Sequence, residues 1–214
     1  FIVYFQNFSN TYDSLENLKI KYDSALIDNR IVGLQIATRP DCLSDEIIEY
    51  LGELNERTNL WVELGLQTVN EKTAKYIRRG YENKVYFDAV KRLKENGIEV
   101  VTHIIIGLPN ETKQDALKTT QTAVNAGTNG IKFHLLHVLQ GTDLAKEYEA
   151  GVFSCLELEE YAQILKECIA LLPEETVVHR ITGDGAKKDL IAPLWSADKK
   201  RVLNFLNKFL SFND

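Results

Sequence analysis

LWVELGLQ, residues 60–67, is an apolar segment that ends in a polar residue and is followed by a helical pattern. Three more segments repeat this arrangement: 32–41 (VGLQIATRPD), 98–109 (IEVVTHIIIGLP) and 130–142 (GIKFHLLHVLQGT). A strand, a polar strand end and a helix that recur at intervals of roughly thirty residues are typical of parallel α/β barrels. We therefore predict an α/β fold, a partial (β/α)6 TIM-like barrel of parallel strands, with a functional site where the strands end.

The composition favours a globular protein of a reducing compartment. The 214 residues carry a formal net charge of −6, which argues against a broadly basic nucleic-acid surface. Cys42, Cys155 and Cys168 are too few and too irregularly spaced for a disulfide framework, so we expect a cytoplasmic protein. No apolar run is long enough for a membrane span.

The predicted elements cover most of the sequence. Methionine is absent and the sequence begins at Phe1 inside an apolar run, so we expect it to be part of a longer protein. We assign residues 1–151 to a barrel core and residues 152–214 to a helix–strand–helix extension that closes the barrel. We predict strands at 1–6, 31–38, 60–67, 98–106, 130–139 and 176–181, and helices at 11–27, 44–57, 70–77, 85–96, 112–126, 157–172 and 198–209.

One face of each predicted strand is unusually polar. Strand residues two apart share a face, and the aliphatic residues are expected to lie under the helices. The opposite set would then point into the barrel: Gln35, Arg39, Glu63, Gln67, His103, Lys132 and His134. Because unpaired polar groups are costly to bury, we interpret the interior as a binding chamber. The alternative is that some of these residues are hydrated at the strand ends.

Single features are weaker. Gly107 with Glu111 after a buried strand suits a ligand close to the backbone, or only a tight turn. His134 and His137 are three residues apart on one predicted strand and would point to opposite faces, which argues against a metal site. The segment 179–185 (HRITGDG) is predicted to be a functional loop.

The motifs together resemble a known family. The segments ATRPD (37–41), ELGLQ (63–67), RRGY (78–81), IIIGLPNET (104–112) and HVLQGTDLAKEYEAG (137–151) resemble radical S-adenosylmethionine (radical SAM) proteins. The branch that they most resemble contains the Elongator catalytic subunit and the oxygen-independent coproporphyrinogen oxidases. HRITGDG (179–185) and IAPLWS (191–196) resemble a small bacterial subfamily of iron–sulfur oxidoreductases of unassigned substrate.

The resemblance implies two cofactors, a 4Fe–4S cluster and S-adenosylmethionine, and a 5′-deoxyadenosyl radical that abstracts hydrogen from a substrate. By the same resemblance, the cofactor-binding residues are Thr38, Arg39, Glu63, Gln67, His103, Gly107, Leu108, Glu111, His137, Val138 and Leu139. Candidate catalytic residues are Arg39, His179, Arg180 and Asp184. The family's Cys-x3-Cys-x2-Cys loop does not occur in this sequence, so we expect the first strand and the cluster cysteines to precede Phe1, and no metal ligand within it.

The resemblance also implies partners. The substrate is unknown, and an RNA base, for example in tRNA, is one candidate, with Arg39, Arg78, Arg79, Arg180, Lys187 and Lys188 as candidate contacts. A flavodoxin or ferredoxin would serve as electron donor. Two other classes remain open: a metal-independent barrel lyase or aldolase that uses Lys132, and a non-catalytic binding barrel without a cluster.

Overall fold

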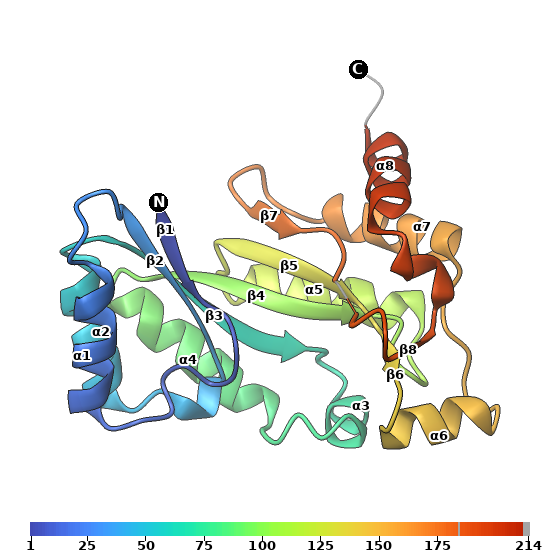
Figure 1. Cartoon of the computed structure of the whole chain (residues 1–214), viewed down its shortest axis with the longest axis horizontal. Helices are drawn as coiled ribbons and strands as arrows, with labels where there is room; N and C mark the ends of the chain where they lie inside the picture. The colour runs from blue at the N-terminus through green and yellow to red at the C-terminus, as the bar shows by residue number, and fades with distance from the viewer. Residues whose placement is uncertain (184, 212–214) are drawn as a thin grey trace.

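Six parallel strands form the centre of the protein. The computed structural model describes residues 1–183 and 185–211. Its main sheet has the order β1-β2-β3-β4-β5-β7, as Figure 1 shows. The strands are β1 (Ile2–Phe5), β2 (Gly33–Thr38), β3 (Asn59–Gln67), β4 (Glu99–Ile106), β5 (Gly130–Leu135) and β7 (Val177–Arg180). The predicted partial barrel of six parallel strands is confirmed.

The helices follow the strands as the pattern predicts. They are α1 (Leu15–Ala25), α2 (Asp45–Asn55), α3 (Glu71–Tyr76), α4 (Asn83–Glu95), α5 (Lys113–Asn125), α6 (Asp143–Glu149), α7 (Leu158–Ile169) and α8 (Lys199–Leu210). Side chains cap their first turns: the Ser44 hydroxyl accepts from the backbone of Ile47, and Asn70 caps α3 in the same way. Such caps satisfy backbone N–H groups that have no partner inside the helix.

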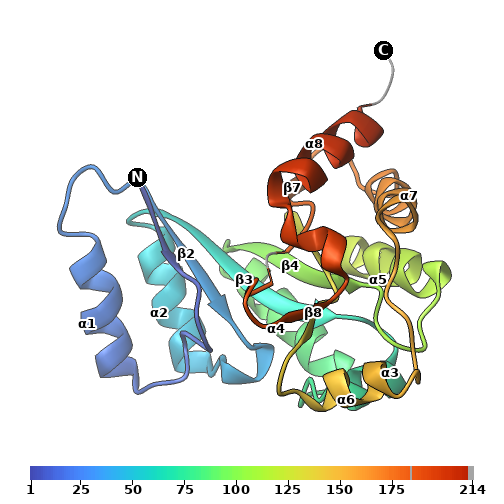
Figure 2. The same ribbon diagram turned by 45° about the vertical axis from the view of Figure 1, so that its right-hand side comes forward.

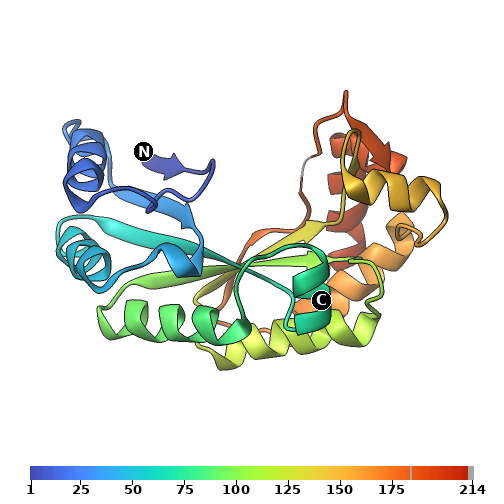
Figure 3. The same ribbon diagram turned by 90° about the horizontal axis from the view of Figure 1, so that it is seen from below.

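The sheet is curved, and its two faces differ in chemistry. Figure 3 shows α1, α2, α4 and α5 along the outer side of the curve, with the inner side left open. The outer face belongs to the main hydrophobic core, where Val62, Leu64 and Leu66 of β3 are fully buried. The alternate residues of each strand point to the inner face, so the predicted division into an aliphatic and a polar face is correct.

The predicted strand at 130–139 is not continuous. The backbone N–H of Leu136 still donates to Ile106, but β4 ends there and offers no further partner. The chain then forms β6 (Val138–Leu139), which pairs antiparallel with β8 (Leu190–Ala192). The prediction of one strand was therefore wrong beyond Leu135, and β8 and α6 were not predicted.

The C-terminal part packs beside β5. Figure 2 shows α7 and α8 next to each other at this side of the sheet. Two hydrogen bonds connect segments within this part: the Tyr161 hydroxyl donates to Ile181 O, and Trp195 Nε1 donates to Leu156 O. In the part of the chain that the structure describes, no helix is both long and apolar enough to cross a bilayer.

Candidate functional site

A buried carboxylate, Glu63, is the centre of the inner face. It lies in the middle of β3 and its side chain has no exposed surface. Its Oε2 accepts from the Tyr4 hydroxyl at 2.8 Å and from His103 Nε2 at 2.7 Å, while Oε1 accepts from Lys132 Nζ at 2.5 Å. The Lys132 ammonium also donates to the Tyr4 hydroxyl at 3.1 Å. One carboxylate thus joins strands β1, β3, β4 and β5.

Charge complementarity keeps this carboxyl group ionised. Burial alone would raise the pKa of Glu63, but the hydrogen bonds and charges of His103 and Lys132 outweigh burial and lower it to about 2. Burial lowers the pKa of Lys132, partly offset by Glu63, and raises that of Tyr4, with Glu63 adding to the rise. The group is therefore a neutralised ion pair, with Glu63 fully occupied by partners from this chain.

Two histidine rings extend the polar surface toward the strand ends. The rings of His103 and His134 lie 4.9 Å apart, centroid to centroid. The His103 side chain is 19% exposed and its Nε2 faces Glu63, which leaves Nδ1 directed away from the carboxylate. Burial, aided by the charges of His103, Arg180 and Lys132, lowers the pKa of His134 to about 3, so this imidazole is neutral at pH 7. His134 Nε2 is buried without a hydrogen-bond partner among the described residues.

His137 lies closer to His134 than the sequence predicted. A Cβ built on Gly183 would be 3.3 Å from His134 Nδ1 and 3.6 Å from His137 Cε1. Both rings therefore meet the same glycine, because the chain bends between β5 and β6. The expectation that they point to opposite faces was wrong. The described residues nevertheless hold no group of three or more side chains suited to a metal ion.

A pocket of about 520 Å³ opens at the carboxyl ends of the strands. Of the predicted site residues, Arg39, Gln67 and Leu108 line it, together with Ile105 and Leu136. The remaining lining residues come from the α3–α4 region and from the start of α6: Tyr76, Ile77, Arg78, Arg79, Tyr81, Thr142, Asp143, Leu144 and Glu147. The lining combines aliphatic and polar side chains, which suits a ligand that has both characters.

Neighbouring side chains hold Arg39 in place at this pocket. Its guanidinium pairs with Asp41 at 2.7 Å, donates to Arg79 O at 3.1 Å and lies 5.0 Å from the centre of the Tyr81 ring. The Tyr81 hydroxyl in turn donates to Gly65 O. Arg39 is therefore held on three sides, with 42% of its side chain still exposed.

Gln67 and Gly107 have backbone conformations that side chains seldom adopt. Gln67 has a φ of +63° at an irregularity of β3, and its amide folds back over Gly65. Gly107 follows β4 with a φ of +87°, and a Cβ there would lie 3.0 Å from Leu156 Cδ1. The strained backbone of Gln67 agrees with its place in the lining of the pocket, since such positions are common at ligand sites.

Several predicted cofactor residues are engaged elsewhere. The Thr38 hydroxyl lies 2.6 Å from that of Thr11 on the helix side of β2, so it does not reach the inner face. Glu111 accepts from Thr68 Oγ1 at 2.6 Å, and burial raises its pKa. Val138 is buried in a small apolar cluster with Ala145 and Ala192, and it pairs with β8 as Leu139 does.

The candidate catalytic residues of the tail are only partly brought together. Arg180 lies opposite Lys132 in the β5–β7 register, so it belongs to the inner face. The ring of His179 lies against Gly130, where a Cβ would be 2.6 Å from His179 Nε2. Asp184 is outside the described residues.

Two residues of this region could not be identified from the sequence. Tyr4 contacts Glu63, and Tyr81 contacts Arg39, only in the folded chain. The alternation of residues along the first strand could have placed Tyr4 on the inner face. The structure also corrects one suggested RNA contact. The Arg79 side chain is only 2% exposed and donates to the carbonyls of Leu66, Thr68 and Tyr81, so it stabilises the α3–α4 loop.

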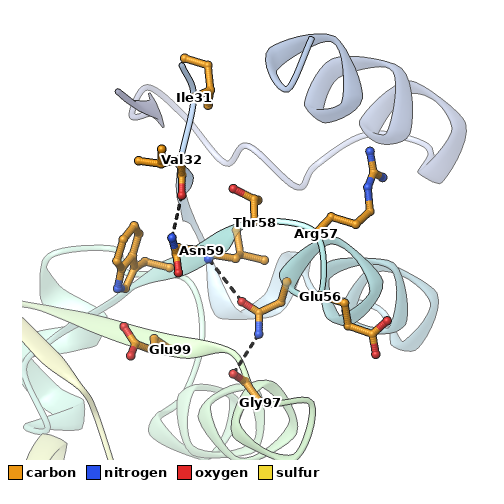
Figure 4. Close-up of a pocket in the computed structure, with 11 residues that line it drawn as sticks. Ile31, Val32, Glu56, Arg57, Thr58, Asn59, Gly97 and Glu99 are labelled. Atoms are coloured by element: carbon orange, nitrogen blue, oxygen red, sulfur yellow. Dashed lines mark hydrogen bonds between the residues drawn. The ribbon is translucent and has the colours of Figure 1, made fainter. Parts of the chain in front are cut away.

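A second pocket, of about 570 Å³, lies at the amino ends of β2, β3 and β4 (Figure 4). The two asparagines that line it donate hydrogen bonds to backbone carbonyls. Asn59 Nδ2 donates to Val32 O at 2.7 Å, and Asn55 Nδ2 donates to Gly97 O at 3.0 Å. Because barrels carry their active sites at the opposite ends of the strands, we assign this pocket a structural role.

Comparison with known proteins agrees with the geometry of the carboxyl ends. The family model described as "Radical SAM superfamily" matches residues 7–123, and the "Radical_SAM C-terminal domain" model matches residues 128–211. The uncharacterized protein YtqA of Bacillus subtilis is 46% identical over 98% of this chain and 65% of its own length. Protein YhcC of Escherichia coli K12 is 35% identical over 99% of this chain and 69% of its own length. The chain belongs to the radical SAM superfamily, and it spans about two thirds of the length of these two relatives.

More distant relatives agree with the predicted branch. The tRNA uridine(34) acetyltransferase of Methanocaldococcus infernus is 27% identical over 73% of this chain and 29% of its own length. The structure of M. infernus Elp3 with an N-terminal deletion superimposes with a TM-score of 0.69 at 23% identity, covering 83% of this chain and 42% of that one. Coproporphyrinogen III oxidase (HemN) from E. coli covers 94% of this chain and 38% of its own, with a TM-score of 0.50 at 14% identity. The predicted relation to the Elongator and coproporphyrinogen oxidase branch is thus confirmed.

Proposed function

We propose that the complete protein is a radical SAM enzyme that binds S-adenosylmethionine in the pocket at the carboxyl ends of the strands. The observation that carries this proposal is the convergence of Arg39, Gln67, Ile105, Leu108 and Leu136 from separate strand ends on one pocket. Membership of the superfamily supports the identity of the ligand.

The residues of the pocket fit S-adenosylmethionine. The flat ring of an adenosyl group can pack against the aliphatic side chains of Ile105, Leu108 and Leu136. The Gln67 amide and the Arg39 guanidinium can bind hydroxyl and carboxylate groups at the rim. When it is reduced by one electron, bound S-adenosylmethionine supplies methionine and a 5′-deoxyadenosyl radical that abstracts hydrogen from a substrate.

The cysteines of this chain do not fit an iron–sulfur cluster. Cys42 follows β2, Cys155 follows α6, and Cys168 is fully buried in α7, so they come from three separate elements. Within the described residues no three ligands meet. We therefore propose that cysteines outside this chain hold the cluster, with a flavodoxin or ferredoxin as the source of electrons.

The inner face would position the substrate below the cofactor. Glu63 and Lys132 neutralise each other, so they supply a rigid floor in place of a free acid or base. His103 and His134 present imidazole groups above this floor. The C-terminal extension at residues 152–214 would shield the radical from water, since Gly183 and Gly185 lie against His134 and His137.

The aldolase alternative receives little support. Its Schiff base requires a lysine whose amine is free to attack a carbonyl group. Lys132 is 6% exposed and bonded to both Glu63 and Tyr4. The pair would have to break before any substrate could react.

An RNA base is our proposed substrate class. It is supported by the similarity to a tRNA uridine(34) acetyltransferase, whose name states a tRNA substrate. Arg78 remains a suitable contact, because its side chain is 79% exposed at the edge of the pocket, where it pairs with Asp143.

Anaerobic reconstitution tests the proposal. The complete protein is loaded with iron and sulfide, reduced with dithionite and mixed with S-adenosylmethionine, and 5′-deoxyadenosine is quantified by chromatography. We expect brown absorbance and 5′-deoxyadenosine release, and an S-adenosylmethionine Kd raised at least tenfold by Gln67→Ala. The matched control Asn59→Ala, at the opposite ends of the strands, should leave that Kd unchanged. No 5′-deoxyadenosine from a cluster-loaded protein would contradict the proposal and favour a non-catalytic barrel.

A further inference from the structure

Arg180 is a cation of the inner face whose side chain has no partner in the described part of the chain. It is half-buried near the end of β7, in register with Lys132. Its backbone belongs to the β5–β7 ladder, but its guanidinium takes part in no hydrogen bond or ion pair among residues 1–183 and 185–211. The Lys132 charge beside it is already neutralised by Glu63 at 2.5 Å, so that carboxylate does not serve Arg180 as well.

The surroundings of Arg180 are electrostatically positive. Its charge lowers the pKa of Lys132 and His134, which requires the guanidinium to be near both groups. On the inner face, the carboxylate of Glu63 is bonded to three partners, and Glu99 lies at the amino end of β4. A half-buried arginine without a counter-ion is costly unless a ligand supplies the charge.

A second polar group near Arg180 is also unsatisfied. His134 Nε2 is buried without a hydrogen-bond partner, and the ring is neutral at pH 7. A neutral imidazole can place its proton on either nitrogen, so Nε2 can donate to an acceptor. Arg180 and His134 therefore offer three kinds of attraction to one group: a planar fork of donors, a positive charge and a further N–H.

We propose that Arg180, with His134 as a second donor, binds an oxyanion of the substrate, a carboxylate or a phosphate, on the inner face. Arginine matches both anions through paired N–H groups. A cationic substrate would be repelled here. The binding itself stands on the contacts above, whereas its role in holding a substrate rests on the proposed function.

The site lies next to the proposed cofactor pocket. His134 pairs with Ile105 in the β4–β5 register, and Ile105 lines that pocket together with Leu136, two residues beyond His134. Residues two apart on a strand are separated by roughly 7 Å. An oxyanion held by Arg180 would thus place the attached part of the substrate directly below the pocket.

Anion titration of the complete, 15N-labelled protein tests this inference without any turnover. Inorganic phosphate and acetate are added at constant ionic strength, and the imidazole nitrogen resonances are followed. The chain has only four histidines, and His134→Gln assigns the signal of interest. Arg180→Gln removes the charge, Arg180→Lys keeps it without the fork, and Arg201→Gln on α8 is the matched surface control.

We expect a saturable shift of the His134 signal in the wild type, at least tenfold weaker anion binding for Arg180→Gln, an intermediate value for Arg180→Lys and no change for Arg201→Gln. Tighter binding of phosphate would identify a phosphorylated or nucleotide substrate, and tighter binding of acetate a carboxylate. No saturable shift in the wild type, or equal affinity in the folded Arg180→Gln variant, would overturn the inference. If Arg180→Gln does not fold, the comparison uses Arg180→Lys and the control Arg201→Gln. Anion affinity equal to that of the wild type in both of these variants would overturn the inference.

The two proposals fail separately. Release of 5′-deoxyadenosine by the wild type without anion binding would remove only the Arg180 site. Anion binding without 5′-deoxyadenosine would leave the Arg180 site intact and remove the proposed function.

Discussion

The two pockets at opposite ends of β3 and β4 are similar in size but differ in how their polar groups are held. At the amino ends, about 570 Å³ is lined by Asn55 and Asn59, whose amides bond to backbone carbonyls of adjacent loops. At the carboxyl ends, about 520 Å³ is lined by Arg39, which pairs with Asp41 and donates to Arg79 O, and by Gln67, whose amide lies against Gly65. Pocket size therefore does not distinguish the two ends of the strands, whereas the partners of the polar groups do.

The difference lies in the kind of partner: the amino-end asparagines bond to backbone carbonyls, whereas the guanidinium of Arg39 pairs with the carboxylate of Asp41 and keeps an exposed surface. At the amino ends, Asn59 Nδ2 and Asn55 Nδ2 each donate to a backbone carbonyl and so connect the starts of neighbouring strands. At the carboxyl ends and on the inner face, Glu63, Arg39 and the histidines form networks between strands. Loss of a member should then have effects that loss of an amino-end asparagine does not.

The largest effect is expected for Glu63→Gln. It leaves the Lys132 ammonium buried without its counter-charge, which should lower the free energy of unfolding by about 3–5 kcal/mol. Urea unfolding measures the loss. The double variant Glu63→Gln/Lys132→Gln should be more stable than Glu63→Gln alone, because no unpaired charge remains. A loss below about 1 kcal/mol would make the network no more important than an ordinary hydrogen bond.

Next in size is a pH effect at His134. Its pKa is about 3 in the folded protein against 6.5 unfolded, so the unfolded chain takes up the proton first as the pH falls. The contribution of His134 to stability is complete above pH 6.5 and is lost toward pH 3, by at most about 1.4 kcal/mol per pH unit. Unfolding measured between pH 6.5 and 4.5 should show a smaller slope for His134→Gln. Asn59→Ala should keep the wild-type slope, and an equal slope for both variants would disprove the assignment.

Gly107→Ala should lower the free energy of unfolding by about 2 kcal/mol. The alanine would have to adopt the φ of +87°, and its Cβ would lie 3.0 Å from Leu156 Cδ1. Gly141→Ala is a matched control: its φ is +82°, but no atom lies within 4 Å of the added Cβ. Gly141→Ala should lower the free energy of unfolding by about 1 kcal/mol, because only the backbone is strained. Thermal unfolding measures both losses. Equal losses would mean that Leu156 moves aside without cost.

The smallest effect should come from Asn59→Ala. One hydrogen bond to Val32 O is removed, so we expect a loss of about 1 kcal/mol. Calorimetric titration should show unchanged affinity for S-adenosylmethionine. Weaker binding would show that the two ends of the strands are coupled, and the contrast between the pockets would no longer hold.

Much of the fold could be predicted because its signals are local. Alternation in 60–67 and 98–106 correctly separated the core face from the inner face, and capping residues such as Ser44 marked helix starts within a few residues. The errors came where a strand lost its neighbour. β5 ends at Leu135 because β4 turns away after Ile106, and no property of the sequence at 130–139 reports where the adjacent strand ends.

The site was predicted less completely than the fold. Glu63, His103 and Lys132 were expected on one face and do meet, since strand parity is a local property. Thr38 was assigned to the cofactor by resemblance, and Glu111 by resemblance and by its place after a buried strand, and their oxygens lie against Thr11 and Thr68. Whether a polar side chain faces a ligand or a neighbour depends on which loop packs beside it, and those loops are distant in sequence.

The sequence by itself determined the parallel strands, their polar inner face and the family of the protein, because period-two alternation and short motifs are encoded in adjacent residues. Only the tertiary structure decided that Glu63 is bonded to Tyr4, His103 and Lys132, and that the Arg180 side chain meets no carboxylate among the residues that the structure describes. The physical reason is that charge pairing depends on distances of a few ångströms between residues that lie tens of positions apart, and only the packed sheet sets those distances.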